Sequence, residues 1–133
     1  MHRLISRTLA LFVILAFTGG VLAAGKLAPQ TSSQSAVTVK ITPRSLEGTE
    51  WEFEVVFDTH SQDLNDDLLK AAALVVDGGA PLAPTGWQGD PPGGHHRKGL
   101  LRFKAAAASA ATLELRLRRP AESAPRVFRW RLR

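Results

Sequence analysis

The sequence predicts an all-β domain, folded as an antiparallel, two-sheet, Ig-like sandwich of about six to seven strands behind an N-terminal hydrophobic leader helix. Three observations predict this class. Apolar and polar residues alternate with a period of two in several segments, Gly and Pro residues separate these segments, and the 133 residues contain no cysteine. Strict alternation is typical of strands with one buried and one solvated face. Without the paired cysteines of antibody domains, the sequence predicts an Ig-like sandwich and nothing narrower.

Residues 1–25 predict a signal peptide or a membrane anchor. Arg3 and Arg7 place positive charge before an apolar run over residues 9–24. The run is shorter than the roughly 20 residues that span a bilayer, and its small residues suit cleavage after Ala23. We therefore expect export with cleavage, with membrane attachment through residues 9–24 as the alternative. Both alternatives predict a periplasmic or extracellular domain.

The remaining chain divides into a spacer and one domain. Residues 26–36 are polar and rich in Ser and Gln, which predicts a flexible spacer, so the sandwich domain is expected over residues 37–133. Alternation predicts strands over residues 37–42, 51–58, 101–104, 113–118 and 128–133. A more apolar strand is expected over residues 72–76, before an Asp-Gly-Gly turn. Residues 66–71 predict a short helical turn, and residues 105–111 a connector.

Charge is unevenly distributed along the domain. Residues 44–94 contain ten acidic and two basic residues, whereas residues 97–133 contain eleven basic and two acidic residues. We expect the basic side chains on the solvated faces of strands, where Glu50, Glu52 and Glu54 can oppose them across a sheet. The aromatic residues fall in the buried phase and leave no stacking platform, so nucleic-acid binding is not expected. Contact with anionic surface polymers is a weaker alternative.

Two polar segments fit neither a core nor an ordinary surface. They are residues 58–63, with the sequence DTHSQD, and residues 87–99, with the sequence WQGDPPGGHHRKG. Both segments, together with the terminal strand that contains a Trp, resemble those of a family of small exported or membrane-anchored bacterial and archaeal domains. Members of this uncharacterised family share the D-T-H-S and P-G-G-H-H-R-x-G motifs. The resemblance covers about residues 37–133 and implies that the two segments belong together, but it implies no activity.

The histidines in these segments predict a possible metal site. Zinc or copper(II) binds imidazole and carboxylate groups without any thiolate. The candidate ligands are His60, His95 and His96, with Asp58, Asp63 or Asp90 as a fourth. The simpler interpretation is a structural or binding network. In that network Arg97 bridges to Asp58, Asp63 or Asp66, and the long turn contributes Trp87, Asp90, Gly93 and Gly94. At least one of the two glycines is expected at positive φ.

Catalysis is not expected. Asp58, His60 and Ser61 are the residue types of a hydrolase triad, but they lie too close together along one strand end for the base to reach the nucleophile in line. No phosphate-binding loop is present. The sequence therefore predicts an exported binding or interaction module of the cell envelope, with an envelope protein or a small ligand as its partner. The alternative is a periplasmic zinc- or copper-binding domain that uses the three histidines.

Overall fold

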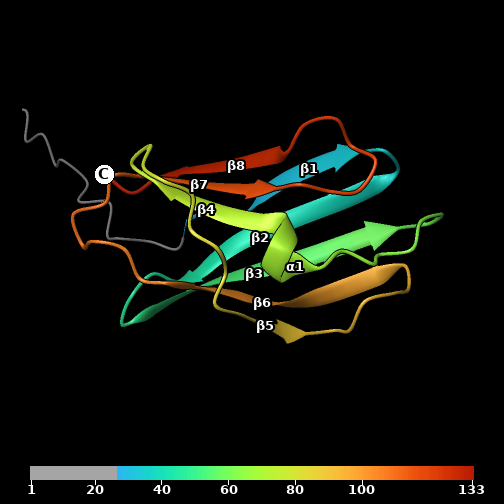
Figure 1. Cartoon of the computed structure of the whole chain (residues 1–133), viewed down its shortest axis with the longest axis horizontal. Helices are drawn as coiled ribbons and strands as arrows, with labels where there is room; N and C mark the ends of the chain where they lie inside the picture. The colour runs from blue at the N-terminus through green and yellow to red at the C-terminus, as the bar shows by residue number, and fades with distance from the viewer. Residues whose placement is uncertain (1–26) are drawn as a thin grey trace, which may run out of the picture.

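The computed structural model describes residues 27–133, and the expected leader over residues 1–25 lies outside them. The described chain forms two antiparallel β-sheets packed face to face (Figure 1). The larger sheet has the order β1-β2-β3-β6-β5 and the smaller sheet the order β4-β7-β8. The strands of the larger sheet are β1 (Gln30–Gln34), β2 (Val37–Ser45), β3 (Glu50–Thr59), β6 (His96–Lys104) and β5 (Gly86–Gly89). Those of the smaller sheet are β4 (Ala72–Val76), β7 (Thr112–Leu117) and β8 (Arg126–Arg131), and the single helical turn is α1 (Leu68–Ala71).

This arrangement confirms the predicted all-β class with two antiparallel sheets. Every segment that the alternation predicts as a strand is a strand, and residues 105–111 form the expected connector. Between residues 27 and 133, no helix has the length and apolar character needed to cross a membrane.

The core lies between the sheets and consists of the apolar phase of the strands. Phe53 packs edge-on against Phe103, with ring centroids 5.7 Å apart, and its ring lies 5.8 Å from that of Trp130 in the opposite sheet. The buried side chains of this phase include Trp51, Phe53, Phe57, Leu101, Phe103, Leu115, Phe128 and Trp130.

Strand β1 lies within the residues expected to form the flexible spacer, so that expectation is wrong for residues 30–34. The strand pairs along its length with β2 through a turn at Ser35 and Ala36, both of which have positive φ. Tight hairpins favour such a turn because its backbone twist matches that of the strands. The strand itself is polar and mostly exposed, as an edge strand is when it discourages pairing with other chains.

Strand β5 is the second strand that the alternation does not indicate. It pairs with β6 from Gly86 to Gly89, inside the region expected to be a long turn. A Cβ atom on Gly99 would lie 2.6 Å from the indole of Trp87. Glycine at position 99 therefore lets the Trp87 ring lie directly over the neighbouring strand.

The exposed basic residues are split between the outer faces of the two sheets, whereas Arg97, Arg119 and Arg126 are buried, so the expectation of solvated basic side chains is wrong for these three. Those of β6 oppose the acidic residues of β3 as expected: Arg102 contacts Glu52 at 3.2 Å and Lys98 contacts Glu54 at 3.8 Å. The expectation is wrong for the arginines of β7 and β8, because these strands belong to the smaller sheet and β3 to the larger one.

Candidate functional site at the loop end

Four connections meet at one end of the sandwich, which we call the loop end. They are the β1–β2 turn at residues 35–36, the segment after β3 at residues 60–67, the β5–β6 loop at residues 90–95 and the β7–β8 loop at residues 118–125. Figure 1 shows them at the same end of the molecule. Both polar segments singled out from the sequence lie here.

Reciprocal backbone hydrogen bonds hold the β5–β6 loop against the segment after β3. The Leu64 amide donates to the Gly94 carbonyl at 3.1 Å, and the Gly93 amide donates to the Leu64 carbonyl at 2.9 Å. Gly93 and Gly94 have φ values of 116° and 73°, which confirms the expectation of positive φ at this turn. The Leu64 side chain is fully buried. The two segments are therefore joined by both backbone bonding and an apolar anchor.

Arg97 reinforces this junction from β6. Its side chain is buried, and Nη1 donates to the backbone carbonyl of Asp66 at 2.6 Å and to that of Leu64 at 3.4 Å. The guanidinium also lies 5.4 Å from the centre of the Trp87 ring. The expected lock is present, but Arg97 contacts backbone carbonyls where a carboxylate was expected. Burial lowers the pKa of Arg97, and the nearby carboxylates of Asp66 and Asp90 oppose that effect.

Asp90 fastens the other side of the β5–β6 loop. Its backbone carbonyl accepts hydrogen bonds from the Trp87 indole at 3.0 Å and from Arg97 Nε at 3.1 Å. Its carboxylate accepts from the Lys98 amide at 2.9 Å. Trp87, Asp90 and Arg97 thus form one network, in which Asp90 is a loop-closing residue.

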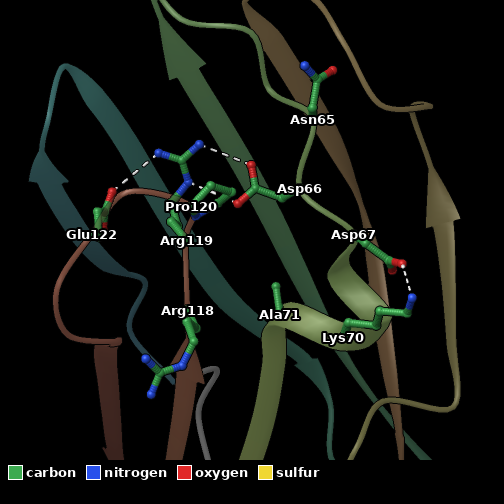
Figure 2. A pocket seen from close by; sticks show the side chains of 9 residues that line it. All are labelled: Asn65, Asp66, Asp67, Lys70, Ala71, Arg118, Arg119, Pro120 and Glu122. Atoms are coloured by element: carbon green, nitrogen blue, oxygen red, sulfur yellow. Dashed lines mark hydrogen bonds and ion pairs between the residues drawn. The ribbon is translucent and has the colours of Figure 1, made fainter.

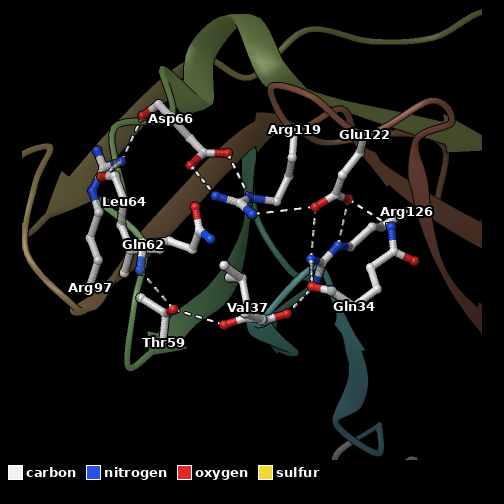
Figure 3. Close-up of polar contacts among 11 residues, drawn as sticks. Gln34, Val37, Thr59, Gln62, Leu64, Asp66, Arg97, Arg119, Glu122 and Arg126 are labelled. Carbon is white, nitrogen blue, oxygen red and sulfur yellow. Dashed lines mark hydrogen bonds and ion pairs between the residues drawn. The ribbon is translucent and has the colours of Figure 1, made fainter.

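The carboxylate of Asp66 is occupied by a second buried arginine, Arg119 (Figure 3). Nε and Nη2 of Arg119 donate to the two oxygens of Asp66, each at 3.0 Å. Nη1 donates to Glu122 at 3.3 Å, and the guanidinium lies 5.8 Å from the centre of the Phe57 ring. This bidentate pair joins the segment after β3 to the β7–β8 loop.

Arg126 continues the chain of ion pairs to β1. Nε and Nη2 donate to the two oxygens of Glu122, each at 2.9 Å. The other three N–H groups donate to backbone carbonyls of Ser32, Val37 and Gln34, at 2.9, 2.9 and 2.8 Å. All five N–H groups of this guanidinium are therefore used inside the protein.

The network of Asp66, Arg97, Arg119, Glu122 and Arg126 links all four connections of the loop end (Figure 3). No buried side-chain nitrogen or oxygen in residues 27–133 lacks a hydrogen-bond partner. The hydrogen bond from Arg126 is the largest influence on Glu122 and lowers its pKa, whereas burial opposes that effect. A buried ion network of this kind tolerates no loss of a member, because the remaining charge would be left without compensation.

The structure does not bring the predicted metal ligands together. Asp58 and His96 are paired in register between β3 and β6, and His96 Nδ1 lies 2.5 Å from Asp58 Oδ1. His60, His95 and Asp63 are exposed. No three His, Asp or Glu side chains in the described part of the chain are grouped closely enough to hold a metal ion. His95 and His96 are neighbours in the chain, and neighbouring side chains of an extended chain alternate in direction.

A pocket of about 400 Å³ opens beside the Asp66–Arg119 pair (Figure 2). Its floor includes this buried ion pair, and its rim carries Asp67 and Lys70 at 4.0 Å from each other. Asp67 also caps α1 by accepting from the Leu69 amide at 3.2 Å. The full lining comprises Asn65, Asp66, Asp67, Lys70, Ala71, Arg118, Arg119, Pro120 and Glu122.

The motifs in the sequence indicate Arg97 but not the buried Arg119 and Arg126, although a signal for both exists. Arg119 falls in the apolar phase of β7, and Arg126 in the apolar phase of β8. Arg97 likewise continues the phase of Leu101 and Phe103. A charged residue in the buried phase of a strand needs a partner, so this parity alone marks all three arginines as members of a buried network.

Comparison of the chain with protein-family models, with curated proteins and with solved structures finds no match. The family resemblance of the two polar segments accordingly stays an expectation from the sequence.

Proposed function

We propose that this protein is an exported binding module of the cell envelope, an immunoglobulin-like sandwich whose ligand site is the pocket at its loop end. The pocket beside the buried Asp66–Arg119 pair is the observation that carries the proposal. Its volume of about 400 Å³ falls within the range that small ligands occupy. Export is supported by the charged and apolar pattern of residues 1–25.

The walls of the pocket are suited to binding because they are held in place before a ligand arrives. Arg119 joins the segment after β3 to the β7–β8 loop through Asp66 and Glu122. Arg97 fixes the same segment through the Asp66 carbonyl. A site with pre-ordered walls avoids much of the ordering cost of binding.

The side chains at the pocket suit a polar ligand. Arg119, which lines the pocket, donates three of its five N–H groups to the carboxylates of Asp66 and Glu122. The exposed rim residues Asp67 and Lys70 offer both signs of charge. We infer that the ligand is a small polar molecule or a polar segment of an envelope protein.

Binding fits these residues better than catalysis does. A general acid or base needs an accessible proton site with a pKa near the working pH. Both oxygens of Asp66 and of Glu122 accept hydrogen bonds from arginines, and the pKa of Glu122 is lowered. Both carboxylates are engaged in ion pairs that hold the loops together, and this role suits the wall of a binding site.

The proposal is tested by site-specific photo-crosslinking of the full chain in cells. A photoreactive residue at Asn65, on the pocket rim, should give a discrete adduct after irradiation, measured as an increase in the intact mass of the purified protein. The matched control places the same residue at Glu47, in the exposed β2–β3 turn. The same mass measurement reports whether the leader is cleaved after Ala23.

Filling the pocket should abolish the adduct. In Ala71→Trp the new indole would occupy the pocket that Ala71 lines, and the Asn65 adduct should disappear while the protein stays folded. Equal adducts at positions 65 and 47, or an adduct that persists in Ala71→Trp, would contradict a ligand site in this pocket.

A further inference from the structure

The outer face of the smaller sheet carries an excess of positive charge, which we call the arginine face. Side chains alternate between buried and exposed along β7 and β8, so the polar residues of both strands share this face. They are Thr112, Glu114 and Arg116 on β7 and Arg129 and Arg131 on β8, with Arg118 directly after β7. Glu114 is the one acidic residue among them. The outer face of the larger sheet differs, because its basic residues face the glutamates of β3.

Glu114 neutralises only part of this charge. Arg116 Nε lies 2.7 Å from one of its oxygens, and Arg129 Nε lies 2.9 Å from the other. One carboxylate is therefore shared by two arginines. Among residues 27–133, no carboxylate lies within ion-pair distance of Arg118 or Arg131. Asp77, at the adjoining end of β4, is held by the amides of residues 111 and 112.

The arginine face is hollowed as well as charged. A hollow of about 510 Å³ lies over β7 and β8. Its lining includes Val75, Leu113 and Trp130, whose side chains are largely buried, and Arg116, Arg129 and Arg131, of which Arg129 exposes 73% of its side chain. The hollow is therefore bordered by cationic groups that can form paired hydrogen bonds to carboxylates.

We propose that the arginine face binds a linear acidic polysaccharide whose sugar rings carry carboxylates. The hollow accommodates part of a sugar ring, and the guanidinium groups around it bind the carboxylates along the polymer. Arg129 and Arg131 stand two residues apart on β8, a spacing of about 6.8 Å, so their guanidinium groups can bind separate carboxylates of one polymer. The hollow of the arginine face shares no lining residue with the loop-end pocket, so the proposal does not rest on the proposed function.

The same face is poorly suited to two other polyanions. A membrane-docking surface inserts apolar side chains into the headgroup boundary, but Val127 is the only large hydrophobic residue that β7 and β8 expose. Single-stranded nucleic acid binds by stacking bases on exposed aromatic rings, and the aromatic residues of β8, Phe128 and Trp130, are buried. The acidic polysaccharide therefore fits the observed surface best.

Binding of the full-chain protein to immobilised polygalacturonate, measured at about 50 mM salt and at increasing salt, tests the proposal. The double variant Arg129→Gln/Arg131→Gln should bind roughly tenfold more weakly, because two charge-assisted contacts are lost. The matched control is Lys40→Gln/Lys104→Gln, which removes the same charge from exposed positions of the larger sheet. Its affinity should change less than twofold. Circular dichroism checks that both variants are folded.

Two further ligands test whether binding requires the carboxylates and whether it is specific for the polysaccharide. Fully methyl-esterified polygalacturonate, which lacks the negative charge, should not bind, and phosphatidylglycerol vesicles should bind more weakly than the acidic polymer. The proposal is overturned if wild type does not bind polygalacturonate or if the two double variants lose affinity equally. Equal binding of the methyl ester, or tighter binding of the vesicles, would overturn it as well.

Discussion

Arg126 is the residue on which most of the loop end depends. Its five N–H groups reach both oxygens of Glu122 and three carbonyls of β1 and β2. Hydrogen bonds from a buried guanidinium offset its desolvation, which costs several kcal/mol. Position 126 therefore requires the fork geometry of arginine and not simply a positive charge.

Replacing Arg126 should be strongly destabilising. In Arg126→Met, Glu122 would lose its closest cation and three backbone carbonyls would lose this donor, so the free energy of unfolding should fall by about 3–5 kcal/mol. Arg126→Lys should recover only part of the loss, because an ammonium has three donors. Chemical denaturation measures both effects. The control is Arg129→Met, which removes an exposed ion pair and should cost about 0–1 kcal/mol; equal losses at the two positions would contradict this account.

Glu122 should make the stability depend on pH in the acidic range. Its pKa in the folded protein is lowered from the ordinary value of 4.5, chiefly by the hydrogen bond from Arg126. The unfolded chain therefore takes up the proton at higher pH than the folded chain does. The stabilisation is complete above about pH 5 and is lost as the pH falls through the lowered pKa.

Glu122→Gln should lower the melting temperature at pH 7 and make its decline below pH 5 shallower than in wild type. Thermal melts at a series of pH values measure this slope. Glu47→Gln changes an exposed residue of the β2–β3 turn and should leave the curve unchanged. A Glu122→Gln curve parallel to that of wild type would show that Glu122 is not linked to folding.

At the scale of the elements, β5 is held to β6 by close contact of two glycines. A Cβ atom on Gly89 would meet the backbone of Gly99 and would lie 2.5 Å from the Lys98 carbonyl oxygen. Because these are backbone atoms, the two strands would have to separate. A Cβ atom on Gly86, at the other end of β5, meets nothing within 4 Å.

Gly89→Ala should therefore destabilise the protein by about 1–3 kcal/mol, as overpacking does. Gly86→Ala should change the free energy of unfolding by less than about 0.5 kcal/mol, and it is the matched control in the same strand. Urea denaturation of both variants provides the measurement. Identical midpoints for the two would mean that β5 is not packed against β6 as described.

Alternation predicts elements with one apolar face, and this explains which strands the sequence reveals. The strands β3 and β8 carry Phe and Trp in one phase, and both are found where expected. The strand β1 reads Gln-Thr-Ser-Ser-Gln and has no apolar phase, so only its pairing with β2 identifies it. The strand β5 spans four residues, too few for alternation to be recognised.

The candidate site was partly predictable for a similar reason. The sequence predicts that the turn with Gly93 and Gly94 belongs with the segment after β3, and hydrogen bonds join the two in the structure. It cannot match Asp66 to Arg119, because that pairing spans 53 positions and depends on how three loops meet. The alternation of buried and exposed positions marks Arg119 and Arg126 as buried, but it does not indicate which carboxylate each one binds.

At the scale of the whole molecule, β1 joins the sheets as well as extending one of them. Arg126 of β8 donates to the carbonyls of Ser32 and Gln34, and the Trp130 indole donates to the Ala28 carbonyl at 2.8 Å. Residues 27–34 therefore close one side of the sandwich, although β1 itself is polar and mostly exposed. The folding unit begins before Val37.

A chain of residues 37–133 should consequently be less stable than a chain of residues 27–133. The shorter chain lacks β1 and two acceptors of Arg126, so its melting temperature should be lower by roughly 10–20 °C, which corresponds to a few kcal/mol for a domain of this size. Calorimetry of the two chains measures the difference. Equal melting temperatures would show that β1 adds no stability and that residues 26–36 act as the spacer first expected.

Combining the truncation with Arg126→Met separates the contribution of these contacts from that of the strand as a whole. If Arg126 stabilises the fold partly through Ser32 and Gln34, Arg126→Met should cost less in the chain of residues 37–133 than in the chain of residues 27–133, because two of the contacts are already lost. The interaction energy from this double-mutant cycle should be at least about 0.5 kcal/mol. Strictly additive losses would mean that the guanidinium is stabilised by Glu122 and Val37 alone, and that β1 contributes only through its pairing with β2.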